Sequence, residues 1–472
     1  MSMSGNAVAT DTLESISPHD QSVVGEVSVS TKQDVQAAVQ RARAAFDGWR
    51  RVPIERRIAY VERFRDLLQM HGEEIARLVS AEMGKPLSQS RDDISSELKY
   101  LDYYIEHGAT NLADEGVVGS ATEDFRVTHE PYGVVAVIAP WNFPVGMTTS
   151  GVIPALIAGN TVVFKPSEHT TLSQKRVIEL LVESEIPEGV VNLVIGDGTV
   201  GSMLLDCPVD LVWFTGSSKV GQQVYRRCGE RFIKALCELG GSSPGVVFAD
   251  VDVEKVVDTL YWSRFLNAGQ VCSAVKRLFV ERPIFDDVVR GLTARLERST
   301  IGNPLDDHDF GPLVSAPQLQ KLEAQMSDAV AKGARVTVGG ARPSAPDLAG
   351  GNYYSPTILT KTTPDMLVMR EEVFGPVLPI VAFDSESEAV ELANGTEYGL
   401  TAEVYTADGE RGLRMSREIQ AGVVAVNTNN YYQPACPVGG YKASGMGREY
   451  GRIGMQEFAQ VKLVALGGGA KQ

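Results

Sequence analysis

Apolar residues recur at helical spacing over the N-terminal quarter of the chain. A threonine followed three residues later by an acid, Thr31 and Asp34, is typical of a capped helix start, and the apolar positions between 35 and 46 keep helical period. A second helix is expected after Pro53, because proline fits a first helical turn. A third is expected over 87–107. The pattern predicts a scaffold of three amphipathic helices.

From residue 134 the pattern changes to short apolar runs that alternate with amphipathic segments. The first series of runs lies at 134–139, 161–164, 190–195, 211–214 and 233–238. The second series lies at 246–248, 277–280, 335–338, 377–382, 402–405 and 423–426. Apolar strands that alternate with helices are typical of parallel sheets covered on both faces. We therefore predict the α/β class, with two doubly wound parallel-sheet domains.

Composition and charge narrow the classes of partner. The 472 residues carry a formal net charge of −16, which argues against nucleic-acid binding and against attachment to anionic membranes. Five cysteines form no C-x-x-C pair and six histidines show no metal-ligand spacing, so neither a disulfide framework nor a metal site is predicted. The N-terminus shows no signal peptide, and the longest apolar run, 133–139, is too short to span a bilayer. A cytoplasmic protein is expected.

Ligands of doubly wound sheets bind at the carboxyl ends of strands, so the segments between predicted elements are candidates for chemistry. The stretch from Phe265 to Cys272 ends a predicted helix at Gly269 and precedes a β-rich run. A cysteine after such a break can present its sulfur to a cleft beside free backbone N–H groups, which suits a thiolate nucleophile. The alternative is a small buried hydrophobe, which most free cysteines are.

Polar groups follow several of the predicted strands. Asn142 lies between two prolines and two aromatics, and its amide can donate to an oxyanion or satisfy a turn. Lys165 and Glu168 suit the hydroxyls of a ribose or form a plain surface ion pair. Glu238 precedes a leucine and two small glycines, which leave room for the water that a general base would activate. Glu372, ahead of an aromatic and a tight turn, is a candidate ligand for a second ribose.

Two glycine turns compete as phosphate sites. Residues 196–201 spell a literal G-x-G-x-x-G between a strand and a helix, but the acid expected about 20 residues later is absent. The turn at 214–221 also joins a strand to a helix through glycine, and the N–H groups of such a turn can meet a phosphate. Spacing alone does not choose between them.

Taken together, these motifs stand in the order found in the aldehyde dehydrogenase superfamily, which the chain resembles from about Ser15 to Val464. The segments that carry the resemblance are 140–144, 165–168, 214–221, 238–241, 265–272 and 372–376, with 153–160 and 439–445 similar as well. The resemblance implies a Rossmann-like cofactor domain, a catalytic domain and a small β flap for oligomerisation. Their expected bounds are 1–111 with 131–239, then 240–440, then 112–130 with 455–472. A homodimer or homotetramer is expected.

By resemblance, Cys272 is the nucleophile, Asn142 the oxyanion donor and Glu238 the general base. The reaction implied is oxidation of an aldehyde to the carboxylic acid through a cysteine thiohemiacetal and a thioester. One rival is a coenzyme A-acylating enzyme, which generally lacks the base at position 238. Another is a catalytically silent structural relative such as a lens-type crystallin, which has no need of all three residues.

The resemblance implies NAD as the cofactor, with NADP as the alternative. The cofactor residues that it implies are Trp141, Lys165, Ser167, Glu168, Gly216, Ser217, Glu372 and Phe374. Lys165 and Glu168 would hold the adenosine ribose, and the Glu168 carboxylate favours NAD because it would repel a 2′-phosphate. Ser217 would meet the pyrophosphate and Glu372 the nicotinamide ribose. The turn at 196–201 then lies near the adenine.

The substrate is an aldehyde that the sequence does not specify. Succinate-semialdehyde dehydrogenases, which the chain broadly resembles, place an arginine where this chain has Ser150 and often a second cysteine where it has Ala274. A semialdehyde would therefore need another cation. Tyr431 and Tyr432 are expected to wall the tunnel, which suits aliphatic and aromatic aldehydes equally.

Overall fold

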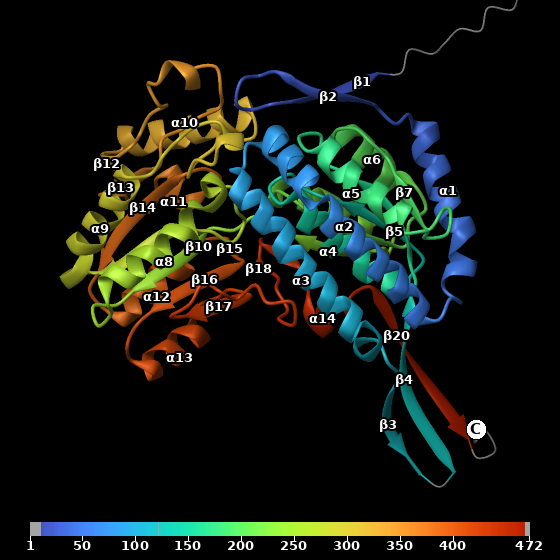
Figure 1. The fold of residues 1–472 in the computed structure, drawn as a ribbon. Helices are drawn as coiled ribbons and strands as arrows, with labels where there is room; N and C mark the ends of the chain where they lie inside the picture. The colour runs from blue at the N-terminus through green and yellow to red at the C-terminus, as the bar shows by residue number, and fades with distance from the viewer. Residues whose placement is uncertain (1–10, 121, 468–472) are drawn as a thin grey trace, which may run out of the picture.

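The protein folds into two mainly parallel β-sheets, each covered by helices, and a smaller sheet that projects from the body (Figure 1). The computed structural model describes residues 11–120 and 122–467. The predicted α/β class with two doubly wound sheets is confirmed. No helix in these residues is long and apolar enough to cross a membrane.

The first sheet has the strand order β19-β9-β8-β5-β6-β7. Its strands are β5 (Val134–Ile138), β6 (Thr161–Lys165), β7 (Val191–Leu193), β8 (Leu211–Thr215), β9 (Lys234–Glu238) and β19 (Gly445–Met446). All are parallel except β19, which runs antiparallel to β9 with Gly445 opposite Glu238. Residues Gly445 and Met446 therefore close one edge of this sheet.

Two separate hydrophobic cores cover the faces of the first sheet. Along β5, Val135 and Val137 join one core while Val134, Ala136 and Ile138 join the other, as the alternation of side chains along a strand requires. The first core is formed with α2 (Ile54–Met83), α3 (Leu87–Asn111), α4 (Pro144–Ile157) and α5 (Thr171–Glu183). The second is formed with α1 (Lys32–Trp49), α6 (Gly198–Asp206) and α7 (Ser218–Gly229).

Local signals account for where two of these helices begin. Thr31 and Asp34 form the expected capping box, in which each side chain bonds the other residue's backbone N–H. Helix α4 begins at Pro144, two residues after Asn142, because proline needs no N–H partner in a first turn.

The second sheet has the order β12-β13-β14-β11-β10-β16-β17, and only β12 is antiparallel to its neighbour. Its strands are β10 (Ser243–Val247), β11 (Val275–Glu281), β12 (Arg335–Val338), β13 (Thr357–Thr360), β14 (Val377–Phe383), β16 (Thr401–Tyr405) and β17 (Val423–Val426). The accompanying helices are α8 (Val253–Phe265), α9 (Phe285–Glu297), α10 (Ala316–Ala331), α11 (Leu367–Arg370), α12 (Glu386–Asn394) and α13 (Gly409–Glu418). Neither β13 nor α12 was predicted.

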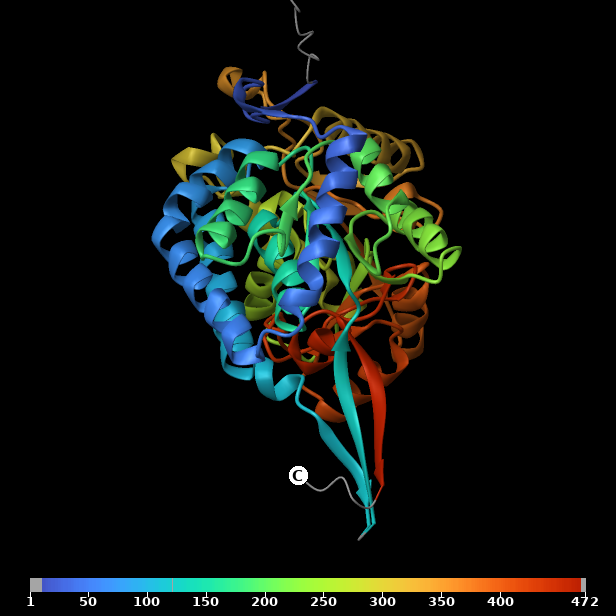
Figure 2. The same cartoon turned by 90° about the vertical axis from the view of Figure 1, so that its right-hand side faces the viewer.

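The projecting sheet is formed by β3 (Glu115–Gly119), β4 (Glu123–Pro131) and β20 (Ala459–Gly467), in the order β20-β4-β3. Figures 1 and 2 both show it extending away from the two larger sheets, next to α14 (Gly451–Gln456). The strands of this sheet thus come from the two segments expected to form a flap, 112–130 and 455–472. A hairpin of β1 (Thr12–Ile16) and β2 (Val23–Ser28) lies at the opposite end of the molecule, and short β15 (Tyr398–Gly399) pairs with β18 (Tyr441–Lys442).

Candidate active site

A cavity of about 680 Å³ is lined by segments from both large sheets. Seven of the predicted site residues line it: Trp141, Asn142, Gly216, Ser217, Cys272, Glu372 and Phe374. They follow β5 and β8 of the first sheet and the α8 and α11 helices of the second. The other four, Glu238, Lys165, Ser167 and Glu168, lie outside its lining.

Cys272 follows a left-handed turn that reverses the chain between α8 and β11. Asn267, Ala268 and Gly269 have φ angles of 52°, 51° and 74°, a conformation that costs energy for residues with a Cβ. At Gly269 a Cβ would lie 2.4 Å from the carbonyl oxygen of Gly375, so only glycine fits there. The turn confirms that the helix breaks ahead of the cysteine.

Two buried amides hold this turn in place. Asn267 donates from its backbone N–H to Gln89 Oε1 (2.8 Å) and from Nδ2 to the Asn142 carbonyl (3.0 Å). Gln270 accepts at Oε1 from the Val314 N–H (2.9 Å) and donates from Nε2 to the Asn267 carbonyl (3.1 Å). Because buried amides are costly unless bonded, these contacts define one conformation for the segment that carries Cys272.

The Asn142 amide points into the same turn. Its Nδ2 donates one hydrogen to the Gln270 carbonyl at 3.1 Å, and the residue is 6% exposed. An amide nitrogen carries two hydrogens, so a second donor remains for a group in the cavity. Asn142 and Cys272 both line that cavity, which is the arrangement an oxyanion donor needs.

The thiol of Cys272 is held in its neutral form. Burial raises its pKa to about 12, and the carboxylates of Glu372, Glu449 and Glu238 act in the same direction. Lys276 is the cation that opposes them. A thiolate therefore forms only when charge or a proton acceptor is added to the site.

Glu238 ends β9, between β8 and β19, and is 8% exposed. Its Oε1 has no hydrogen-bond partner among the described residues. Burial, and then the neighbouring carboxyl of Glu449, raise the pKa of Glu238 well above its usual value, while Arg448 acts against them. The next two residues, Leu239 and Gly240, line the cavity, so the Glu238 carboxyl stands directly behind the cavity wall.

The Glu372 carboxylate packs on the turn after Glu238. Its Oε1 accepts from the Gly241 N–H (3.1 Å) and from Lys276 Nζ (2.9 Å). At Gly240 a Cβ would lie 2.2 Å from Glu372 Oε2, so the glycine makes room for the acid. Next to it the rings of Phe374 and Trp141 meet edge to face, with centroids 5.4 Å apart.

The two competing glycine turns differ in how their helices are capped. At the literal G-x-G-x-x-G, the Asp197 carboxylate accepts from the Thr199 N–H (2.8 Å), and an acid there opposes the binding of a phosphate. Helix α7 instead begins at a neutral cap, Ser217, whose hydroxyl accepts from the Val220 N–H at 3.4 Å. Only this second turn lines the cavity.

Lys165 is buried rather than exposed, so the surface ion pair with Glu168 is not what the structure has. Its ammonium donates to the carbonyls of Pro166 (2.6 Å) and Gly196 (2.7 Å), and burial lowers its pKa. Ser167 caps the following turn, with its hydroxyl accepting from the His169 N–H at 3.2 Å. The His169 ring in turn meets Trp141 edge to face at 6.3 Å, which links this segment to the cavity.

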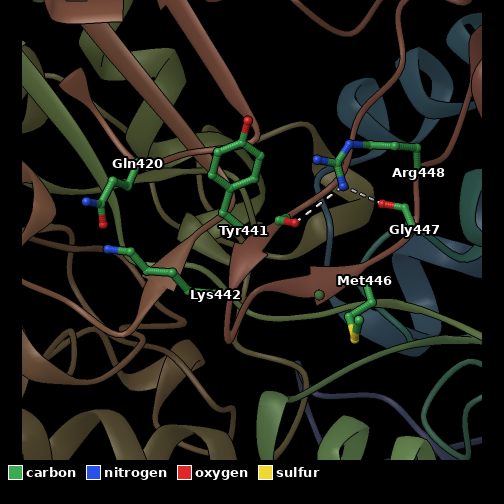
Figure 3. A pocket seen from close by; sticks show the side chains of 8 residues that line it. Gln420, Tyr441, Lys442, Met446, Gly447 and Arg448 are labelled. Carbon is green, nitrogen blue, oxygen red and sulfur yellow. Dashed lines mark hydrogen bonds between the residues drawn. The ribbon is translucent and has the colours of Figure 1, made fainter. Parts of the chain in front are cut away.

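A second, more open pocket lies over Tyr441, with Lys442 on one side and Arg448 on the other (Figure 3). Arg448 donates to the carbonyls of Gly447 (2.6 Å) and Gly440 (3.4 Å), and Lys442 to two carbonyls near the end of α12. Both cations are therefore committed to the backbone. None of the predicted site residues lines this pocket.

A protein-family model, described as the aldehyde dehydrogenase family, matches residues 6–464. The chain belongs to the aldehyde dehydrogenase family. It is accordingly an oxidoreductase that acts on aldehydes with a nicotinamide cofactor.

Individual aldehyde dehydrogenases match over nearly the whole chain. Betaine aldehyde dehydrogenase of Bacillus subtilis (strain 168) is 39% identical, covering 95% of this chain and 93% of that protein. An NADP(+) succinate-semialdehyde dehydrogenase of Escherichia coli (strain K12) is 34% identical, covering 97% and 95%. The crystal structure of betaine aldehyde dehydrogenase from Staphylococcus aureus in complex with NAD+ superposes with a TM-score of 0.93 at 35% identity, covering 98% and 93%.

Sequence reasoning did not identify several residues that build this aldehyde dehydrogenase site. Asn267 and Gln270 brace the cysteine turn, Arg264 donates to carbonyls of the loop after Glu372, and Lys276 bonds Glu372 itself. These residues are polar and lie in or next to a predicted helix and a predicted strand. Polar residues in such positions indicate a site only once their hydrogen-bond partners are known.

Proposed function

We propose that Cys272 is the nucleophile in the oxidation of an aldehyde to a carboxylic acid. Its thiolate adds to the aldehyde carbon, and the carbonyl oxygen takes up the electron pair as an oxyanion. The free hydrogen of the Asn142 amide donates to that oxyanion. When the oxyanion collapses, a hydride leaves the same carbon and a thioester to Cys272 remains. The shared cavity of Cys272 and Asn142 is the observation that carries this proposal.

In the second half of the reaction Glu238 acts as the general base. It takes a proton from water, the resulting hydroxyl adds to the thioester carbon, and the Cys272 sulfur leaves with the bonding electrons to release the acid. Support comes from the position of Glu238 behind Leu239 and Gly240 and from its unpartnered Oε1. Water is the acceptor of the acyl group here, so hydrolysis is favoured over transfer to coenzyme A.

NAD+, with NADP+ as the alternative, supplies the acceptor for the hydride. The residues proposed to hold it are Trp141, Lys165, Ser167, Glu168, Gly216, Ser217, Glu372 and Phe374. The neutral cap of α7 suits its pyrophosphate, and the Glu372 carboxylate can accept from ribose hydroxyls. The segment of Lys165 reaches the cavity through His169 and Trp141, and the Glu168 carboxylate favours NAD+.

We propose that the substrate is an aldehyde without a carboxylate. The cavity that Cys272 lines is rich in aromatic side chains, among them Tyr100, Phe143, Trp262, Tyr431, Tyr432 and Tyr450. The acidic side chains among them, Glu97 and Glu403, are buried, and burial raises the pKa of both carboxyls, so neither can pair with the carboxylate of a semialdehyde. The nearby Lys85 is already paired with Asp93 at 3.2 Å.

Ser150, the position where succinate-semialdehyde dehydrogenases have an arginine, is buried in α4 and is absent from the cavity lining. A semialdehyde remains the second candidate, because the E. coli relative is named for one. The Bacillus subtilis relative is named for betaine aldehyde, so the tests include both.

The division of the chain and its assembly are further proposals. We propose a cofactor domain at 1–111 and 131–239, a catalytic domain at 240–440, and oligomerisation segments at 112–130 and 455–472. The exposed edges of β3 and β20 support pairing with a second copy, as a homodimer or homotetramer. The five unpaired cysteines suit the reducing cytoplasm that we expect.

The test is an NADH-formation assay with hexanal, benzaldehyde, betaine aldehyde and succinate semialdehyde, each with and without coenzyme A. Free acid as the product supports hydrolysis, and acyl-coenzyme A would overturn it. Cys272→Ala should bind NAD+ but form no NADH. Cys436→Ala, which changes an exposed cysteine, is the matched control. Full activity of Cys272→Ala, or no activity of the wild type with any aldehyde, would refute the proposed reaction.

A further inference from the structure

Lys276 is a charged side chain with no exposed surface. It lies at the start of β11, four residues after Cys272. Its Nζ donates to the Cys272 carbonyl at 2.5 Å and to Glu372 Oε1 at 2.9 Å. Burying an ammonium group costs free energy unless the group is paired and hydrogen-bonded. The two partners of Lys276 therefore fix the position of its Nζ.

Through these bonds Lys276 joins three separate segments of the site. Cys272 belongs to the turn after α8, Glu372 to the loop after α11, and Gly241, which bonds the same Glu372 oxygen at 3.1 Å, to the turn between β9 and β10. The ammonium also lies 5.6 Å from the centre of the Phe374 ring. No other cation bonds Glu372 within the described residues.

We propose that Lys276 is a positioning residue that promotes ionisation of the Cys272 thiol and orients Glu372 for the cofactor. This inference rests on the proposed roles of Cys272 and Glu372. It adds a residue that touches neither the aldehyde nor the reacting carbon, because Lys276 is absent from the cavity lining.

The sign of the effect on the thiol follows from the surrounding charges. Lys276 is the one cation among the groups that shift the Cys272 pKa, while Glu372 on its loop, Glu238 on β9 and Glu449 beside β19 all raise it. The phenols of Tyr431 and Tyr432, which also face the thiol, are neutral because their own pKa values are raised. Removing Lys276 therefore removes the one charge that lowers the pKa of the thiol.

Alkylation of Cys272 by iodoacetamide measures the thiolate directly. In the cofactor-free enzyme the rate is followed between about pH 7 and 10 by mass spectrometry of the Cys272 peptide, which separates it from Cys436. Lys276→Met should lower the rate about tenfold or more at the lower end of this pH range, because a neighbouring opposite charge lowers a pKa by about one to three units. The difference should narrow at higher pH, because burial lowers the pKa of Lys276 itself. Glu372→Gln should raise the rate, since it removes a carboxylate.

Two comparisons separate this effect from damage to the fold. Lys255→Met makes the same change at an exposed lysine of α8 and should leave the rate unaltered. Lys276→Arg retains the charge and should alkylate within about threefold of the wild type. If Lys276 only held the structure together, its replacement would loosen the turn that carries Cys272, and the alkylation rate would stay the same or increase. That outcome in Lys276→Met would overturn the effect on the thiol.

The effect on Glu372 is measured by NAD+ binding, followed through protein fluorescence. Lys276→Met should weaken binding about tenfold, because Glu372 loses its anchor, and Lys255→Met should not. An unchanged Kd in Lys276→Met would overturn the orientation of Glu372 by Lys276. Neither measurement needs an aldehyde, so failure here is distinguishable from failure of the dehydrogenase reaction, which Cys272→Ala and the aldehyde panel test.

Discussion

Replacing Asn142 by alanine should remove one donor from the oxyanion and leave the rest of the site in place. Of the two hydrogens on Nδ2, one is committed to the Gln270 carbonyl at 3.1 Å and the other is free for the cavity. Losing a single oxyanion donor costs a factor of about 10²–10³ in kcat, or about 2.7 to 4 kcal/mol of transition-state stabilisation. We expect that loss in kcat with saturating aldehyde and NAD+.

The cost of the same change in folding stability should be small. The Gln270 carbonyl keeps a second donor, Asn267 Nδ2 at 3.4 Å, so the alanine variant loses the net contribution of one hydrogen bond, about 1 kcal/mol. Urea unfolding should therefore show a modest decrease, while the rate of Cys272 alkylation and the Kd for NAD+ stay near those of the wild type. These two measurements separate a lost donor from a misplaced thiol.

Asn394→Ala is the matched control for Asn142→Ala. Asn394 donates to the Glu418 carbonyl (2.9 Å) and accepts from the Gln420 N–H (2.8 Å), outside the cavity lining. Replacing Asn394 should lower the stability at least as much as Asn142→Ala does and should leave kcat unchanged. If Asn142→Ala retained kcat within about threefold of the wild type, Asn142 would not be an oxyanion donor. A loss of alkylation along with kcat would show instead that Asn142 acts by holding the cysteine turn.

Three further changes test the surroundings of the site. Gly240→Ala places a Cβ 2.2 Å from Glu372 Oε2, and should raise the KM for NAD+ about tenfold with little change in Tm; an unchanged KM would argue against a cofactor role of Glu372. Gly269→Ala meets the Gly375 carbonyl at 2.4 Å and has a positive φ, and should cost about 2 kcal/mol or more in urea unfolding; wild-type stability would contradict the required glycine. Burial raises the pKa of Glu449 to about 8, so the folded protein holds a proton that the unfolded chain loses near pH 4 to 5, and this stabilisation declines as pH rises from about 5 to about 8. Glu449→Gln should remove up to about 1.4 kcal/mol per pH unit of that decline. Identical pH profiles of unfolding for the variant and the wild type would show that Glu449 does not cause the decline.

The sheets could be predicted from the sequence because their central strands are continuous apolar runs. β5 and β8 are buried on both faces, and hydrophobicity alone indicates such strands. β19 escaped prediction because its two residues owe their conformation to a distant neighbour. At Gly445 a Cβ would lie 2.1 Å from the Cys237 carbonyl, so the glycine reflects close contact with β9 rather than a flexible loop.

The candidate site divides in the same way. Asn142, Glu238 and Cys272 could be proposed as candidates from the sequence because each follows a recognisable strand or helix and has a side chain suited to one chemical role. Lys276 could not, because it stands in what reads as a strand. It is buried only because the Cys272 carbonyl and the carboxylate of Glu372, from a segment far along the chain, meet it. No local pattern reports where those partners will be.

The proposed roles of Cys272 and Glu238 are easier to reconcile when their charges are considered together. Each group raises the cost of ionising the other, since the Glu238 carboxylate raises the pKa of the Cys272 thiol and such coupling is reciprocal. A Glu238 that still carries its proton does not oppose the thiolate that attacks the aldehyde. Once the thioester has formed, the sulfur no longer carries the charge of the thiolate, and one obstacle to ionising Glu238 is gone. The base then becomes available in the half of the reaction that needs it, while the thioester is waiting for water.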